Sequence, residues 1–366
     1  MDIEVLAAGA LGGVRAERWA RALSAPGRPA HPVLSPDFAR AVGGVRPAAR
    51  VAVLESDGRC GWLGFEERGH GVGEVIGKGF TDVGGLLCEP GLPRPDYRAV
   101  LAACGLAVWR FVQAEPAGPP LGGAGTAVPP GVRPLGRVPS PLADLSEGYE
   151  AHRTAVRRRS PASAKTLRKH ENRLARGEVP VRYVFDERDP RLLGTMLRWK
   201  SAQYRASGWS DPLAAERGTE LARVLAGLRT PTCTGALSVL YLGDEPAAMQ
   251  LTLRSATVLT CCVTAFDHRY AAHSPGTVLL GRVIATAAEL GVTTVDLGTG
   301  DSEYKQAFTT EERTLPQGLL WRPTLVAGGA LLHDAAERTA RDFITARPWL
   351  RSRVRGALRR YGTLRG

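Results

Sequence analysis

The chain has 366 residues, of which 44% are hydrophobic and 23% are charged, and it carries a net charge of +12. This length allows two domains of ordinary size, each with its own core, and the composition excludes a disordered or fibrous chain. No stretch approaches the roughly 18 to 20 uninterrupted apolar residues of a membrane span. Residues Met1 to Glu4 lack the basic start and long apolar run of a signal peptide, so we expect a cytoplasmic protein.

The positive charge gathers in two segments. Nine Lys or Arg accompany one acid between Arg153 and Arg176, and nine Arg accompany one acid between Arg338 and Arg365. Together these segments carry more net positive charge than the whole chain, so the rest is slightly acidic. Such patches attract phosphates, anionic lipid head groups or nucleic acid. The plainer interpretation of both segments is a solvated helix face.

The six cysteines predict neither a metal site nor a nucleophile. None of them has a CxxC spacing, and Cys261 and Cys262 are adjacent in an apolar run in which neighbouring side chains face opposite sides. We therefore expect reduced, mostly buried thiols and no bound metal.

The first part of the chain shows short strands and one clear helix. In chain order, we predict strands over residues 51–55 and 60–65 that form a hairpin, a helix over 97–104 that ends at Gly105, and a strand over 108–112. Residues 116–141 are rich in Pro and Gly and have little periodic pattern, which indicates a linker. A first domain over residues 1–115 follows from this.

The second part has a clearer order of elements. We predict helices over 163–176, 190–207 and about 213–228, strands over 179–185, 236–242, 247–253 and 257–266, a helix over 275–290 and a strand over 293–297. Sequential hairpins followed by helix and strand are typical of an α+β fold with a mixed, mostly antiparallel sheet flanked by helices. This domain spans residues 142–328, and an Arg-rich helical tail follows over 329–366.

The start of the helix at Pro275 is suited to an anion. Ser274 is placed to cap this helix, Pro275 fits its first turn, and Gly276 lets a ligand approach the backbone. Unpaired N–H groups at a helix N-terminus attract phosphate. The plainer interpretation is a well-capped helix start without a ligand.

A second loop lies close behind this helix in the sequence. The strand over 293–297 is followed by Gly298 and Gly300, and then by Tyr304 and Lys305. Because both loops follow strands of one sheet, we expect them to open at the same sheet end and form one site. There the Tyr304 hydroxyl can protonate a leaving group, and the Lys305 cation can hold a phosphate or carboxylate. The alternative is an ordinary surface pair.

Five segments of the second part resemble a known family. "LRKHENRL", "WKSAQYRASG", "GALSVLYLGDEPAAM", "AFDHRYAAHSPGTVLL" and "VDLGTGDSEYKQAF" occur in this order, which is similar to the FemAB-like branch of the GNAT superfamily, including CelD-like proteins of cellulose biosynthesis. The first part, with "HPVLSPDF", a hairpin and "FTDVGGLL", looks like the degenerate N-terminal half that these proteins often carry. The resemblance thus implies tandem GNAT-like (acyl-CoA N-acyltransferase) domains, the first without a Ser-Pro-Gly helix start of its own.

The resemblance also implies roles for particular residues. The donor would be bound by Phe266, His273, Ser274, Pro275, Gly276, Thr277, Gly298 and Gly300. The residues that face the acceptor would be Lys165, Arg168, Lys169, Lys200, Gln203 and Tyr204. Catalysis would fall to Tyr304, Lys305 and Asp267, with Asp267 as a general base, although an Asp in this position more often opens a turn.

The function implied is N-acyl transfer, most simply acetyl transfer, from acetyl-CoA or another acyl-CoA to an amine on a small molecule, sugar or peptide. The amine would attack the thioester directly, without a covalent enzyme intermediate and without a metal. A second hypothesis keeps the fold and changes the donor to an aminoacyl-tRNA, with the Arg-rich segments on the RNA backbone. A third is a non-catalytic scaffold whose Arg-rich tail lies on an anionic membrane or on nucleic acid.

Overall fold

The structure is a computed structural model that describes residues 1–114, 129–177, 179–207, 211, 213, 217–300, 302–332, 335 and 339. Most of the predicted Arg-rich tail and residues 116–128 of the predicted linker lie outside these residues. A helical stretch that starts at residue 325 continues into the described part of this tail.

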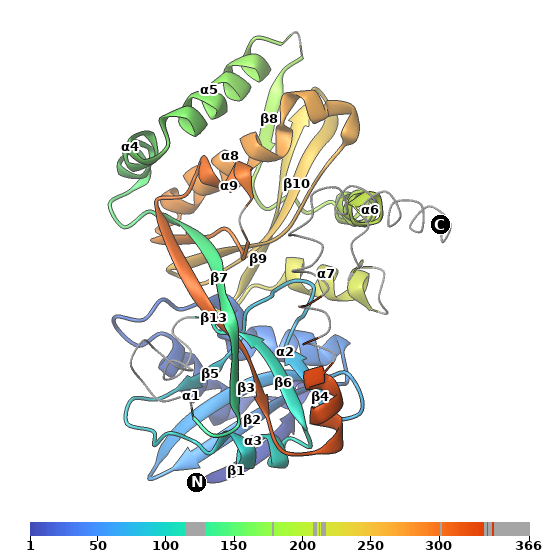
Figure 1. The fold of residues 1–366 in the computed structure, drawn as a ribbon. Helices are drawn as coiled ribbons and strands as arrows, with labels where there is room; N and C mark the ends of the chain where they lie inside the picture. Colours follow the sequence, from blue (N-terminus) through green and yellow to red (C-terminus); the bar gives the residue numbers. More distant parts are fainter. Residues whose placement is uncertain are drawn as a thin grey trace.

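Strands and helices are distributed over both halves of the chain (Figure 1). The strands are β1 (Asp2–Ala7), β2 (Ala49–Ser56), β3 (Arg59–Glu67), β4 (Val72–Val75), β5 (Leu86–Cys88), β6 (Val108–Val112), β7 (Val132–Asp144), β8 (Val181–Val184), β9 (Thr234–Leu242), β10 (Glu245–Arg254), β11 (Val258–Phe266), β12 (Thr294–Asp296) and β13 (Glu311–Trp321). The α-helices are α1 (Gly13–Leu23), α2 (Pro36–Val45), α3 (Tyr97–Ala103), α4 (Tyr149–Arg159), α5 (Pro161–Ala175), α6 (Pro190–Ser207), α7 (Gly218–Gly227), α8 (Pro275–Glu289) and α9 (Glu303–Gln306). The 3-10 helices are η1 (Ala8–Ala10), η2 (Pro32–Leu34) and η3 (His268–His273).

One mixed sheet runs through both halves. Its order is β1-β2-β3-β4-β6-β13-β7-β12-β11-β10-β9-β8, with β5 paired to β3. Strand β13 pairs with β6 of the first half and with β7, so these long strands join the two halves of the sheet (Figure 1). The predicted α+β fold with a mixed, mostly antiparallel sheet and flanking helices is confirmed.

Most predicted elements are confirmed, and the linker prediction is wrong for its last ten residues. The hairpin is β2 with β3, and β9, β10 and β11 are consecutive antiparallel strands. Residues 132–141, however, belong to β7. Proline lacks only the N–H donor, and the carbonyls of Pro139 and Pro141 still accept hydrogen bonds from Gly300 and Leu297. The segment can therefore pair as a strand through its carbonyls, although its composition is that of a loop.

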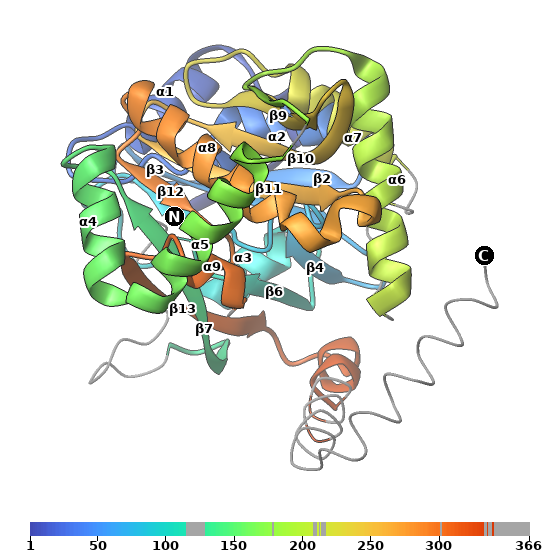
Figure 2. The ribbon, with the colours of Figure 1, turned by 90° about the horizontal axis from the view of Figure 1, so that it is seen from above.

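The two faces of the second half of the sheet are covered by different helices. Leu193 and Met196 of α6 share a core cluster with Val263 and Ala265 of β11. The other face carries α8, which packs in a second cluster with Leu174 of α5 and with other residues of β9 to β11. Helices α4 and α5 lie outside α8, while α6 stands apart from them (Figures 1 and 2).

Candidate functional site

The parallel strands β11 and β12 separate soon after they begin to pair. Their pairing ends at Thr260 and Asp296, where β12 stops, whereas β11 continues to Phe266. One extra residue, Cys262, stands in β11 opposite the step from Leu251 to Thr252, which is a β-bulge and bends the strand further. Along the rest of β11 no described strand pairs with the edge that faces away from β10. This leaves a gap between two strand ends, suited to a ligand that crosses the sheet.

Helix α6 supplies three of the predicted residues to this gap. The ammonium group of Lys200 donates to the carbonyl oxygen of Thr264 at 3.1 Å, and the amide of Gln203 donates to that of Phe266 at 3.2 Å. Both carbonyls belong to the end of β11. The Lys200 nitrogen also lies 4.9 Å from the centre of the Tyr204 ring. Burial lowers the pKa of Lys200 below its ordinary value, so its charge is weakly solvated.

The loop before α8 ends with Ser274 in the left-handed backbone region, at φ 51° and ψ 48°. The prediction that the Ser274 side chain caps the helix is wrong, because this conformation leaves its side chain without a capping hydrogen bond. Instead its carbonyl oxygen accepts hydrogen bonds from Thr277 and Val278. A non-glycine residue held in this region is strained, and such strain often accompanies ligand-binding loops.

Gly276 brings the first turn of α8 against the end of β11. A β-carbon built on Gly276 would lie 3.7 Å from Cδ1 of Phe266 and 4.0 Å from Cγ2 of Thr264. These are ordinary contact distances, so the protein itself does not require glycine here. Pro275 has no N–H, and those of Thr277 and Val278 donate to the Ser274 carbonyl, which leaves the Gly276 N–H for an anion in the gap. Nearby, Nδ1 of His273 is buried and has no hydrogen-bond partner among the described residues.

Asp267 is held by its neighbour and is a poor base. Its Oδ1 accepts from the Arg269 backbone N–H at 2.8 Å and its Oδ2 from the Arg269 guanidinium at 2.9 Å. The hydrogen bond from Arg269 keeps the pKa of Asp267 below its ordinary value. This geometry is that of a cap on η3, as expected for an Asp that opens a turn.

The glycine loop on the other wall of the gap is held by Lys305. Gly298 and Gly300 have φ of 79° and 90°, a region in which glycine carries no penalty. The Lys305 ammonium group donates to the carbonyls of Gly298 at 3.0 Å and Thr299 at 2.9 Å, and the residue is only 6% exposed. In this structure its ammonium group thus donates to carbonyls of the glycine loop.

Tyr304 is the more accessible member of the predicted catalytic pair. It is 44% exposed. Loss of water around the hydroxyl, with a smaller contribution from the nearby Cys261 thiol, raises the pKa of Tyr304 to about 12. At neutral pH the hydroxyl is protonated and can donate. Burial likewise raises the pKa of Cys261 to about 12, so this thiol is not a ready nucleophile.

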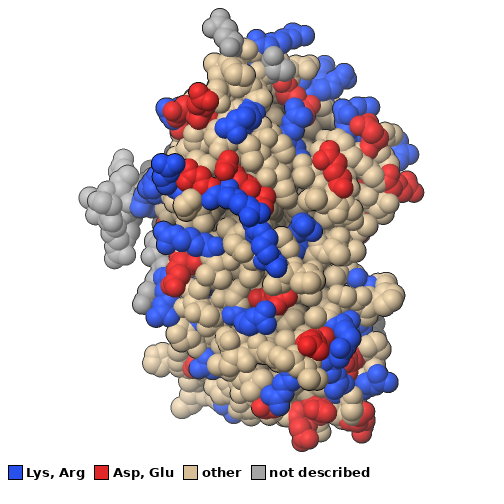
Figure 3. Space-filling model, turned by 180° about the vertical axis from the view of Figure 1, so that it is seen from behind, with Lys and Arg blue, Asp and Glu red and all other residues tan. Residues whose placement is uncertain are grey.

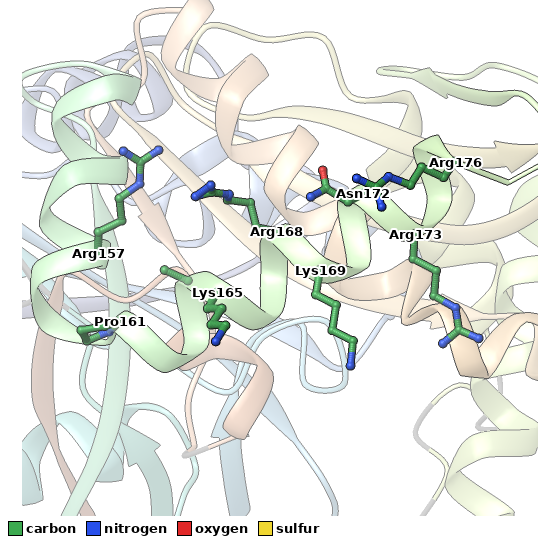
Figure 4. A pocket seen from close by; sticks show the side chains of 9 residues that line it. Arg157, Pro161, Lys165, Arg168, Lys169, Asn172, Arg173 and Arg176 are labelled. Carbon is green, nitrogen blue, oxygen red and sulfur yellow. The ribbon is translucent and has the colours of Figure 1, made fainter.

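Helix α5 carries a cationic groove beside the loop that precedes α8. The groove has a volume of about 940 Å³, and Figure 4 shows most of its labelled side chains along α5, with Arg157 on the neighbouring α4. It is lined by Arg157, Pro161, Ala164, Lys165, Arg168, Lys169, Asn172, Arg173 and Arg176. Arg173 donates to the carbonyl of Ala272 at 3.1 Å, which joins the groove to the loop that precedes α8. On the face seen from behind, by contrast, basic and acidic side chains are interspersed (Figure 3).

The structure separates the residues that were predicted to face one acceptor cleft. Lys165, Arg168 and Lys169 belong to α5, on the α8 face of the sheet, whereas Lys200 and its neighbours belong to α6 on the opposite face. The gap between β11 and β12 is the place where the two faces meet. The single cleft is therefore corrected to two surfaces, one on each face of the sheet.

Neither a metal cluster nor a membrane span occurs among the residues that the structure describes. Within that part of the chain, no group of three or more His, Cys, Asp or Glu is placed to hold a metal ion. None of its helices is both long and apolar enough to span a bilayer.

Known proteins resemble this chain in one segment of its sequence and in its fold. Residues 161–306 match the protein family described as "Acetyltransferase (GNAT) domain". FemX is similar over 87% of this chain and 97% of its own, with a TM-score of 0.52 and 10% identity. A tandem GNAT protein from the clavulanic acid biosynthesis pathway is similar over 88% of this chain and 100% of its own, with a TM-score of 0.51 and 15% identity. L-PGS from Bacillus licheniformis gives a TM-score of 0.48 at 13% identity, over 80% and 90% of the two chains. No curated protein matches the sequence.

Residues 161–306 therefore match a GNAT acetyltransferase domain, and the similarity to the tandem GNAT structure over 88% of this chain shows a shared fold. The protein is an enzyme of the N-acyltransferase class.

Proposed function

We propose that the protein transfers an acyl group, most simply acetyl, from an acyl-CoA to an amine. The observation that carries this proposal is the gap between β11 and β12, flanked by the first turn of α8 on one side and the Gly298–Gly300 loop on the other. An acyl-CoA has a phosphate-rich end and a thin thioester end. The phosphates suit the helix N-terminus and the cations of α5, and the thioester suits a narrow gap between strands.

The predicted donor-binding residues of the loop before α8 are placed where they can contact the phosphates of an acyl-CoA. Gly276 adds no side chain of its own to the first turn of α8, so a pyrophosphate can approach the Gly276 N–H with the Phe266 ring and the Thr264 methyl group beside it. Arg173 links the α5 groove to the loop that ends at His273 and Ser274. Pro275 and Thr277 belong to the same first turn, so the predicted donor residues of this loop remain together in the proposal.

The chemistry is a direct displacement at the thioester. The amine nitrogen attacks the carbonyl carbon and a C–N bond forms. The nitrogen of this tetrahedral intermediate loses its extra proton to water, and the C–S bond breaks. Tyr304, whose hydroxyl stays protonated, gives its proton to the leaving thiolate and regains one from solvent. The acceptor amine reaches the gap from the α6 face, past Lys200, Gln203 and Tyr204. Asp267 is disfavoured as the base because Arg269 occupies its carboxylate.

A second candidate donor is an aminoacyl-tRNA. The observation in its favour is the extent of the α5 groove, where five cations extend over about three helical turns and Arg157 of α4 adds a sixth. This is more positive charge than one terminal phosphate of a coenzyme needs, and single-stranded RNA carries a regular series of phosphates. The similarity to FemX shows the fold alone and does not choose between the two donors.

Direct binding separates the two donors. Purified protein is titrated with acetyl-CoA, with longer acyl-CoAs and with charged tRNA, followed by calorimetry. Saturable binding of an acyl-CoA, and acyl transfer to a panel of amines of small molecules, amino sugars and peptides, is the expected result. Binding of tRNA without any binding of acyl-CoA would replace the first proposal by the second.

Several finer assignments stay proposals. They are membership of the CelD-like part of the FemAB-like branch, a cytoplasmic location, catalysis that needs no metal, the division at residues 115 and 142, and contact of the Arg-rich tail with an anionic membrane. The motif "AFDHRYAAHSPGTVLL" supports the first of these, and the charge of residues 338–365 supports the last.

A further inference from the structure

One buried carboxylate connects the first half of the chain to the glycine loop of the second. Nε2 of His31 lies 2.9 Å from Oδ2 of Asp296, and the two side chains are 8% and 10% exposed. The other carboxylate oxygen, Oδ1, accepts a hydrogen bond from the backbone N–H of Gly298 at 2.7 Å. Asp296 is the last residue of β12, so it stands where the two parallel strands separate.

The position of His31 is set by a segment packed on the second half. Val33 and Leu34 of η2 belong to the same core cluster as Leu251 and Val263, and η2 contacts β10 and β11. The carbonyl of His31 accepts from the N–H of Leu34 at 3.0 Å. The imidazole is therefore fixed by packing that involves both halves, before it reaches Asp296.

The loop itself depends on contacts to its backbone. Lys305 holds the carbonyls of Gly298 and Thr299, and the N–H of Gly300 donates to the carbonyl of Pro139 at 2.9 Å. Two glycines at positive φ have wide backbone freedom, so their place is set by these partners. The Asp296 carboxylate is the partner of Gly298 N–H, and His31 is the partner of that carboxylate.

The charge state of the pair follows from its surroundings. Burial acts to raise the pKa of Asp296, but the hydrogen bond and charge of His31, the Gly298 N–H and the Lys305 cation together keep that pKa below its ordinary value. Asp296 is thus an anion that only accepts, and Nε2 of His31 carries the hydrogen between them. Removal of His31 would leave a buried carboxylate with one partner fewer, which is costly.

We infer that His31 is a positioning residue for acyl transfer, because it holds the Gly298–Gly300 loop in place through the Asp296 carboxylate. The first half then completes the site of the second half, although its own residues do not touch the reacting atoms. The loop-holding role is independent of the reaction; the effect on acyl transfer rests on the function proposed above.

The test compares His31→Ala with His31→Gln and with Val100→Ala, a change on α3 in a separate core cluster. Amide hydrogen exchange of residues 297–300 is measured without any ligand, together with thermal unfolding, acyl-CoA binding and steady-state kinetics. We expect exchange in the loop to rise at least about tenfold in His31→Ala, and kcat/KM to fall roughly ten- to a hundredfold. His31→Gln, which keeps an N–H donor, recovers part of both.

Val100→Ala in α3 is the matched control, since it removes buried packing from a separate core cluster of the first half and leaves η2 and the His31–Asp296 bond in place. It lowers thermal stability without faster exchange in the loop. Unchanged loop exchange in His31→Ala overturns the inference whatever happens to the activity. Faster loop exchange in a protein whose wild type binds no acyl-CoA upholds the role of His31 in the loop and rejects the proposed reaction.

Discussion

The ammonium group of Lys200 lies 3.1 Å from the carbonyl oxygen of Thr264, at the open edge of β11. Burial of this cation lowers the pKa of Lys200 below the ordinary value of about 10.4. The folded protein therefore binds this proton less tightly than the unfolded chain does. The cost of burying the charge is present at neutral pH and disappears as pH rises from the lowered pKa to the ordinary one.

The first prediction follows from the direction in which the lowered pKa of Lys200 changes stability with pH. Relative to Lys200→Met, the wild type becomes more stable as pH rises from neutrality to about 10.4. Urea unfolding of both proteins across this range measures the difference. Lys165→Met, a change at an exposed lysine of α5, should show no such trend. A wild type that loses stability relative to Lys200→Met as pH rises would contradict the prediction.

The second prediction concerns Gly276. Its surroundings accept a methyl group, since the nearest atoms to a built β-carbon are 3.7 Å and 4.0 Å away, and Ala is a better helix former than Gly by about 0.5 to 1 kcal/mol. Gly276→Ala should therefore fold at least as stably as the wild type. If phosphates approach this turn, the same methyl group should weaken acyl-CoA binding roughly tenfold or more.

Gly227→Ala in α7 is the control for Gly276→Ala. A β-carbon there meets nothing within 4 Å, so it tests the helix propensity without a ligand nearby. Calorimetric titration with acetyl-CoA should give wild-type affinity for Gly227→Ala. Equal donor affinity in Gly276→Ala and wild type would place the phosphates elsewhere.

Local elements were predictable from the sequence because their signals are local. The strands around Gly243 and the helix that begins at Pro275 are confirmed, since turn residues and apolar spacing lie within a few positions of each other. Strand β7 was missed because its prolines look like a loop until the partner β13 is known.

The arrangement of the site was less predictable because it depends on distant parts of the chain. Nothing near Lys305 indicates that its ammonium group bends back to the carbonyl of Gly298. Nothing near Lys169 or Lys200 tells which face of the sheet each helix covers. His31 and Asp296 are 265 positions apart, and only the packing of η2 on the second half brings them together.

The third prediction tests the α5 groove. Lys165, Arg168 and Lys169 are exposed, so their joint replacement by Ala should leave folding intact. Acyl-CoA affinity should fall, and the remaining affinity should depend less on salt concentration. If tRNA is the donor, the slope of log affinity against log salt should weaken by about 0.7 for each phosphate whose cation has been removed.

A triple replacement of Arg21, Arg98 and Arg223 by Ala is the control for total charge, because these exposed arginines lie on other helices. It removes the same net charge from the molecule. Equal effects of the two triple variants on donor binding would show that only net charge matters, and would count against a groove on α5.

The last prediction concerns the proton for the leaving group. Tyr304 is 44% exposed, so Tyr304→Phe should not change folding, but it removes the hydroxyl. If this hydroxyl protonates the thiolate, kcat should fall by roughly 10² to 10⁴ with little change in donor affinity. Because the pKa of Tyr304 is raised to about 12, the wild-type rate should show no alkaline decline caused by this residue at ordinary assay pH.

Tyr241→Phe is the matched control. Tyr241 lies on β9, away from the gap, and its hydroxyl donates to the Glu187 carboxylate at 3.0 Å. That variant should lose some stability and keep its kcat. Steady-state rates measured over a pH series for the three proteins decide the role. The contrary outcome is a wild-type kcat that falls near the ordinary tyrosine pKa of about 10, with no such fall in Tyr304→Phe. The hydroxyl would then titrate normally, and its pKa would not be raised in solution.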